Sequence, residues 1–311
     1  MGVSKRDYII PSAHLAELYH TRYRDGAYIA RKVEHIVQDG FYRSIELPII
    51  EGREDRRRIL KALSIPSSKV GNVIVWSGLY AAEHGLDINS IDETARRKSV
   101  DAIKKLIEES CELGSGNFGV VSGRNVGILD KSDAYRALIK SLTELTRYAK
   151  EHRQNLIFEA LEKFSGRRAL LGTSEDTYEM MEILKPDLPS LYCCYDTAHS
   201  ALNREVIHNG LEHMNKFVGC IHLSNAVLDP EDPLYGDNHL QPGLPGFLTV
   251  KAAASLIETA WRLGLNKEKG VLVCTELRQP DEVPDGLEER CFHVASDFLK
   301  QITIEFMVRE C

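Results

Sequence analysis

Four side chains able to hold a metal ion stand at the ends of apolar, strand-like segments. They are Glu159, Asp196, His222 and Glu276, in the segments Asn-Leu-Ile-Phe-Glu, Leu-Tyr-Cys-Cys-Tyr-Asp, Gly-Cys-Ile-His-Leu and Val-Leu-Val-Cys-Thr-Glu. Three carboxylates gathered around one point with an imidazole would repel one another unless a cation neutralised their charge. Oxygen and nitrogen donors suit Mn²⁺, Mg²⁺, Co²⁺ or Zn²⁺ better than a thiolate-seeking ion. Each residue alone is typical of an ordinary loop or core position, but four in successive strands indicate a metal site.

Short β-branched or apolar runs alternate with longer amphipathic segments along the whole chain, which is the pattern of repeated strand–helix units. Strands are expected at 8–10, 43–47, 73–76, 118–121, 155–159, 190–195, 217–223 and 270–276. Helices are expected at 27–38, 53–63, 92–112, 132–152, 175–184, 203–214, 248–263 and 286–301. Asp92 and Gly114 supply the N-terminal cap and the C-terminal glycine of the third helix.

Eight strand–helix units in 311 residues, with no Pro/Gly/Ser-rich linker, predict one (β/α)₈ TIM barrel domain spanning 1–311. A doubly wound parallel sheet is the alternative. Strands five to eight are neighbours in a barrel, so the four candidate ligands should converge at its carboxyl-terminal face. Residues 224–246 are expected to form a long polar loop on that same face, and loops of this length are usually functional.

Composition narrows the classes of partner. The chain carries 39 Lys and Arg against 46 Asp and Glu, a formal charge of −7, which argues against nucleic acid as a partner. Its seven cysteines include no CxxC pair and indicate reduced thiols. The N-terminus lacks the apolar core of a signal peptide, and no apolar run approaches the ~20 residues of a membrane span. We therefore expect a cytoplasmic protein without membrane or nucleic-acid partners, and a homo-oligomer is compatible with this.

The sequence resembles the xylose-isomerase-like barrel superfamily, which includes ketose 3-epimerases, hydroxypyruvate isomerase, inosose dehydratases and apurinic endonucleases of the endonuclease IV type. The resemblance runs over nearly the whole chain. It is carried by Phe158-Glu159, Asp196-Thr197-Ala198-His199, Ile221-His222-Leu223, Gly236-Asp237-Asn238-His239 with Pro242-Gly243, and Thr275-Glu276-Leu277. The resemblance implies that Glu159, Asp196, His222 and Glu276 bind one divalent ion, with Mn²⁺ favoured. It also implies that Glu159 and Glu276 transfer protons and that His199 contacts the substrate.

This arrangement suits chemistry next to a carbonyl group. A metal chelated by a ketone and its neighbouring hydroxyl stabilises the enediolate that forms when the adjacent proton is removed. Two carboxylates can then serve as base and acid, which either inverts the carbon centre or moves the carbonyl. The expected function is a divalent-metal-dependent sugar or keto-polyol isomerase or epimerase of carbohydrate metabolism, acting on a small-molecule substrate. A lyase of the inosose dehydratase type, which would expel a β-hydroxyl, is the alternative.

Two segments argue against an apurinic endonuclease, a third function of the superfamily. Those enzymes carry extra histidines at the ends of their third and fourth strands, whereas Val75-Trp76-Ser77 and Val121-Ser122-Gly123 have none. His199, Asp237 and His239 nevertheless match a further metal site of the endonucleases, so a second ion at these three residues is an alternative to substrate binding.

Further substrate contacts are expected from residues near the strand ends. They are His14, Glu46 and Trp76, in addition to His199, Asp237 and His239. Ketose 3-epimerases commonly place an arginine near the position of His239, so the substrate specificity of those enzymes is not carried over. Arg278, two residues past Glu276, is expected to pair with that carboxylate.

Overall fold

The computed structural model describes residues 2–281, 287 and 289–309. Its parallel strands form a closed ring in chain order. They are β1 (Ile9–His14), β2 (Ser44–Leu47), β3 (Asn72–Trp76), β4 (Asn117–Val121), β5 (Asn155–Glu159), β6 (Leu191–Asp196), β7 (Val218–Val227) and β9 (Val271–Glu276). Pairing of β9 with both β7 and β1 closes the ring. The predicted (β/α)₈ barrel is thereby confirmed over the doubly wound sheet.

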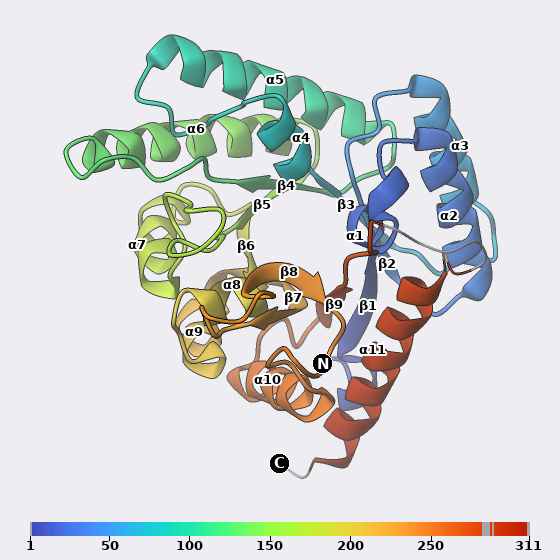
Figure 1. Ribbon diagram of the computed structural model, residues 1–311. Helices are drawn as coiled ribbons and strands as arrows, with labels where there is room; N and C mark the ends of the chain where they lie inside the picture. Colours follow the sequence, from blue (N-terminus) through green and yellow to red (C-terminus); the bar gives the residue numbers. More distant parts are fainter. Residues whose placement is uncertain (1, 282–286, 288, 310–311) are drawn as a thin grey trace.

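Helices surround the ring of strands (Figure 1). The longer ones are α2 (Gly26–Asp39), α3 (Arg53–Leu63), α5 (Glu93–Cys111), α6 (Lys131–Glu151), α7 (Ser174–Leu184), α9 (Ile207–Met214), α10 (Val250–Leu263) and α11 (Arg290–Val308). Short helices α1 (Leu15–Leu18), α4 (Gly78–Glu83) and α8 (Thr197–Leu202) follow β1, β3 and β6. Residues 286 and 288 of the last predicted helix lie outside the described residues, and that helix continues beyond 301. No helix in the described part of the chain is long and apolar enough to cross a membrane.

Local capping sets the bounds of the helices. The Asp92 carboxylate accepts hydrogen bonds from the backbone N–H groups of Thr94 and Ala95, as the sequence predicted. Gly114 follows that helix with a φ of 70°, a left-handed conformation that glycine adopts without steric penalty. Thr249 caps α10 in the same way by accepting from Ala252. The ends of these helices are therefore set by local capping residues that can be recognised in the sequence.

The segment 224–246, predicted as a loop, contains regular structure, so that prediction was partly wrong. Strand β7 continues to Val227, and β8 (Gly236–Leu240) pairs with it antiparallel. His222 consequently lies inside β7 rather than at its end. Asn225 holds the hairpin, since its amide donates to the carbonyls of Gln241 and Gly243. Strand β8 was not predicted because its residues are polar and are flanked by prolines and glycines, so the segment shows no apolar periodicity.

Two apolar layers hold the barrel together. The larger lies between strands and helices and includes fully buried Phe118, Phe158 and Phe292. A smaller cluster fills the barrel interior and consists of Ile74, Trp76, Ile157, Cys194 and Cys220. The six cysteines within the described residues are free thiols, as expected, and Cys311 lies outside those residues.

Gly119 makes room for Trp76. The two residues are register partners on β4 and β3, and a Cβ on Gly119 would come within 2.0 Å of the indole ring. We expect Gly119→Ala to lower the free energy of unfolding by about 1–3 kcal/mol, because the indole must move in a packed interior. Denaturant titration followed by circular dichroism measures this.

Gly116→Ala is the matched control, because open space surrounds the position of its added Cβ. Its free energy of unfolding should stay within about 0.5 kcal/mol of the parent protein. Equal stabilities of the two variants would show that Gly119 is not needed for the packing of Trp76.

Candidate functional site

The strand register brings the four predicted metal ligands together. Asp196 pairs with His222 across β6 and β7, and Glu276 lies level with Ser224, two residues further along β7. One ligand atom from each of Glu159, Asp196, His222 and Glu276 lies within 4.8 Å of the others, and all four side chains are buried. The convergence expected from neighbouring barrel strands is therefore present.

The donor set fits a divalent cation. Glu159 is buried, and its Oε1 atom has no hydrogen-bond partner within the described part of the chain, which leaves a lone pair aimed at the cluster without compensation. The Ser224 hydroxyl contacts Asp196 and lies 3.1 Å from Glu276, so it links two of the carboxylates. Buried carboxylates at such separations are stabilised by a coordinated ion. Three oxygen donors and one imidazole suit Mn²⁺, Mg²⁺, Co²⁺ or Zn²⁺.

Glu46 sets the orientation of His222. Its Oε2 atom lies 2.9 Å from His222 Nε2 and accepts the indole N–H of Trp76 at 2.5 Å. Burial would raise the pKa of Glu46, but His222 and His14 lower it to about 2, so the carboxylate is ionised and only accepts. The proton of a neutral His222 therefore sits on Nε2. Its Nδ1 lone pair then points to the cluster, 3.3 Å from Glu159 and 3.1 Å from Glu276.

This placement changes the role inferred for Glu46. The sequence suggested a substrate contact, but the side chain is fully buried behind His222 and does not line the cavity. A carboxylate that holds the second nitrogen of a metal-binding histidine is a recurring support of such sites. We therefore propose that Glu46 positions His222.

Asp196 titrates near neutrality in the metal-free protein. Burial raises the pKa of Asp196 most, and the charge of His199 lowers it. The charges of Glu276 and Glu159 raise it again, and the net result is a pKa of about 7. For His222, burial lowers the pKa, but Cys194, Glu46 and Glu276 raise it well above its ordinary value. Both groups therefore hold protons that a metal ion at this site would have to displace.

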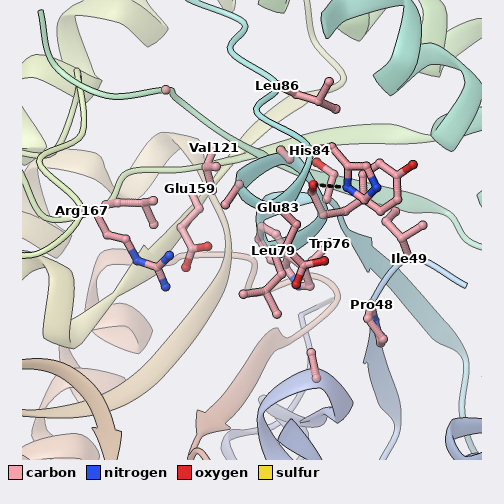
Figure 2. Close-up of a pocket in the computed structure, with 18 of the residues that line it drawn as sticks. Pro48, Ile49, Trp76, Leu79, Glu83, His84, Leu86, Val121, Glu159 and Arg167 are labelled. Atoms are coloured by element: carbon pink, nitrogen blue, oxygen red, sulfur yellow. Dashed lines mark hydrogen bonds between the residues drawn. The ribbon is translucent and has the colours of Figure 1, made fainter. Parts of the chain in front are cut away.

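A cavity of about 810 Å³ opens above this cluster. Glu159 and Glu276 line it, whereas Asp196 and His222 lie beneath its surface. His14, Trp76, His199, Asp237 and His239 also line the cavity, as the sequence suggested. Apolar side chains from the β2 and β3 ends, from α4 and from the segment after α4 form one side of the cavity, including Ile49, Trp76, Leu79 and Leu86 (Figure 2).

The three residues expected at a second metal ion are divided between two groups in the described part of the chain. His199 gathers with Glu162 and Asp237, and its Nδ1 lies 2.9 Å from Glu162 Oε2. His239 gathers with Glu17 and Glu276 instead. It lies 3.0 Å from Asp237 through Nε2 and 2.8 Å from Glu17 through Nδ1. These contacts give both histidines carboxylate partners within the protein and favour a role in holding the substrate.

Glu17, Glu162 and Ser224 contribute to the site and were missed in the sequence. Glu17 and Glu162 each lie three residues after a predicted site residue, and Ser224 lies two residues after His222 on the same face of β7. The predicted pair between Arg278 and Glu276 is wrong, since Arg278 Nε lies 2.6 Å from Glu17. Glu17 belongs to the short helix α1, which carried no periodic signal.

We predict that Glu46→Gln weakens metal binding about 10–100-fold, because an amide no longer holds the Nε2 proton of His222 by charge. Competition against a chromophoric chelator measures the affinity. Glu258→Gln is the matched control, since Glu258 is a buried carboxylate paired with Lys5 outside the cavity. If both variants bind metal as tightly as the parent, Glu46 does not orient His222.

We also predict that metal affinity falls as the pH drops below about 7. A ligand carboxylate must be ionised, and Asp196 with a pKa of about 7 is increasingly protonated below that value. Each displaced proton should reduce the apparent affinity about tenfold per pH unit. Calorimetry in two buffers of different ionisation enthalpy should count at least one proton released per ion near neutral pH. Zero release would contradict the protonated state of the metal-free site.

Comparisons with known proteins agree with this architecture. A structure of L-ribulose 3-epimerase matches with a TM-score of 0.72 at 16% identity, over 95% of this chain and 94% of that one. The IOLI protein with a bound zinc atom matches with a TM-score of 0.72 at 15% identity, over 96% and 99% of the two chains. D-psicose 3-epimerase with D-tagatose, from Clostridium cellulolyticum H10, gives 0.65 at 15% identity, over 95% of each chain.

At these identities the structural matches establish a common fold. No curated protein sequence matches the chain. The profile of one family matches residues 36–261, which is well over half of the sequence. The protein therefore belongs to the xylose isomerase-like TIM barrel family.

Proposed function

We propose that this protein is a divalent-metal-dependent sugar or keto-polyol isomerase or epimerase. The observation that carries the proposal is the division of the four ligand candidates. Glu159 and Glu276 line the cavity, where a substrate can reach them, while Asp196 and His222 lie below. The two residues proposed to move protons are thus the two that a substrate can contact.

The two glutamates approach the substrate position from different sides. Glu159 ends β5 and Glu276 ends β9, and two strands, β6 and β7, separate them in the ring. Burial would raise the pKa of Glu276, but His239 and His222 lower it well below its ordinary value, so Glu276 is an ionised base. One carboxylate can remove the proton beside the carbonyl, and the other can return a proton from a second direction. A divalent ion at the four ligands would stabilise negative charge on the carbonyl oxygen.

The remaining polar groups of the cavity can hold the substrate. Burial would lower the pKa of His199, but Asp196 and Asp237 raise it to about 10, so His199 is a cation at neutral pH and donates hydrogen bonds. The side chain of Asp237 is buried, and its Oδ1 atom has no hydrogen-bond partner among the described residues, so it can accept from a hydroxyl. Trp76 supplies an apolar face, its N–H being held by Glu46. Donors, acceptors and an apolar face together suit a polyhydroxylated ligand.

The names of the structural matches support this class of reaction. Two are described as 3-epimerases, of D-psicose and L-ribulose, and a third structure contains zinc. We propose Mn²⁺ as the resident ion, with Mg²⁺, Co²⁺ and Zn²⁺ as the alternatives that elemental analysis would distinguish. The β3 and β4 ends carry Ser77 and Ser122 beside the cavity, where the apurinic endonucleases have histidines, so we do not propose DNA cleavage.

The test is exchange of a carbon-bound proton in D₂O, followed by proton NMR, with the metal-loaded enzyme and a panel of ketoses and keto-polyols. Glu159→Gln and Glu276→Gln should each lower turnover by at least about 10²–10⁴-fold, because each change removes a base and keeps the volume. Glu51→Gln, an exposed glutamate at the edge of the same cavity, is the control and should retain turnover.

The NMR spectrum of the product tells which reaction occurs. An epimer indicates an epimerase, an aldose an isomerase, and a dehydrated compound a lyase. Retained turnover in both active-site variants would refute the two-carboxylate mechanism. Full activity after complete metal removal would refute the metal dependence.

A further inference from the structure

Arg167 is a half-buried cation that faces the cavity and has no ion-pair partner among the residues that the structure describes. It lies on the loop between β5 and α7, and its side chain points into the same space as the Glu159 carboxylate (Figure 2). Among the described residues, its guanidinium forms no hydrogen bond and no ion pair within 4.0 Å. A guanidinium in a part-buried position is normally compensated by an anion.

The loop that carries Arg167 is held in place on two sides. The Arg167 backbone N–H donates to Glu162 Oε1 at 2.7 Å. The Leu170 N–H donates to the Gly123 carbonyl at 3.0 Å, and the Asn125 N–H donates to the Arg168 carbonyl at 2.7 Å. These bonds fasten the loop to the segment that follows β4, so Arg167 is presented by a fixed backbone.

The next residue, Arg168, has a left-handed φ of 49°, which is uncommon for a residue with a side chain. Arg168 is exposed and does not line the cavity, whereas Arg167 does. The reversal of the chain at Arg168 thus separates two adjacent arginines, with one inside the cavity and one in solvent. Residues held in such conformations cluster at functional sites.

A second arginine, Arg124, also lines the cavity and is exposed. It belongs to the segment after β4 and is bridged through its backbone to Ala169, two residues past Arg167. Its side chain also has no carboxylate within 4.0 Å among the described residues. A third cavity-lining arginine, Arg24, is different because it is neutralised by an ion pair with Glu83.

Three described acidic residues of the cavity and its adjoining loop are already engaged in other contacts. Glu159 belongs to the metal cluster, and Glu162 accepts from the Arg167 backbone and contacts His199. Asp87, which also lines the cavity, accepts from the backbone of Asn89. Positive charge on Arg167 and Arg124 is therefore available to a ligand.

We infer that the substrate carries an anionic group, a phosphate or a carboxylate, which Arg167 and Arg124 bind while its reacting carbons lie against Glu159 and Glu276. This inference rests on the proposed isomerase or epimerase function and names the class of substrate. A guanidinium presents parallel N–H donors that match two oxygens of either group. The cavity of about 810 Å³ is large enough for a sugar with such a substituent.

The experiment compares binding of D-fructose, D-fructose 6-phosphate and D-tagaturonate to the metal-loaded enzyme by calorimetry. One anionic probe should bind at least about tenfold tighter than D-fructose, since hydrogen bonds to charged groups are the stronger ones. Arg167→Gln should remove most of this preference. Arg168→Gln, the same change one residue along, should keep it. The anionic probe that binds tighter identifies phosphate or carboxylate as the recognised group.

Two results would overturn the inference. One is D-fructose binding as tightly as both anionic probes. The other is an Arg167→Gln variant that still binds the anionic probe more tightly than D-fructose by the same factor. If that variant also loses metal affinity, Arg167 acts on Glu159 rather than on the substrate. Metal content is therefore measured for every variant. If an anionic probe binds through Arg167 but no compound of the panel exchanges its proton in D₂O, the proposed reaction is refuted and the anion site is supported. If exchange occurs but no anionic probe is preferred, the anion site is refuted and the proposed reaction is supported.

Discussion

Repulsion among buried carboxylates is the constraint on which the rest of this site depends. Glu159, Asp196 and Glu276 meet at the carboxyl-terminal mouth of the barrel, where little water reaches them. In such surroundings like charges interact strongly, and a carboxylate without compensation takes up a proton. Burial and the charges of Glu276 and Glu159 accordingly raise the pKa of Asp196 to about 7. We therefore propose that the cluster binds a cation, and that protons would take its place if it were removed.

The protein supports this cluster from below with rigid contacts. Glu46 joins His222 to the indole of Trp76, and Trp76 in turn packs against the backbone at Gly119. One chain of contacts thus runs from the packed interior of the barrel to a metal-ligand candidate. Because packed interiors deform little, we propose that Glu46, which does not line the cavity, sets the direction of the His222 ring.

In the cavity above the cluster, some charged side chains have partners of opposite charge within the protein and others do not. His199 and His239 have carboxylate partners in Glu162, Asp237 and Glu17, and apolar side chains cover one side of the cavity. Arg167 and Arg124 differ, since neither has a carboxylate within 4.0 Å in the part of the chain that the structure describes, and Arg167 points into the cavity (Figure 2). The cavity thus has a candidate cation site and two accessible carboxylates in one region and the guanidinium groups of Arg167 and Arg124 in another. This asymmetry can orient a substrate so that one carbon lies between the glutamates.

The sequence by itself determined the repeating βα architecture and the four ligand candidates, because both are expressed locally. Apolar strands followed by a polar residue are visible in any single segment, and Asp92 caps its helix through contacts within three residues. That 1–311 is one domain remains a prediction. The tertiary structure decided which residues meet across the barrel. Glu46 and His222 lie 176 positions apart, and Arg278 reaches Glu17 rather than Glu276. Strand β8 and the inward turn of Arg167 likewise depend on pairing with distant backbone, for which a single segment carries no periodic signal.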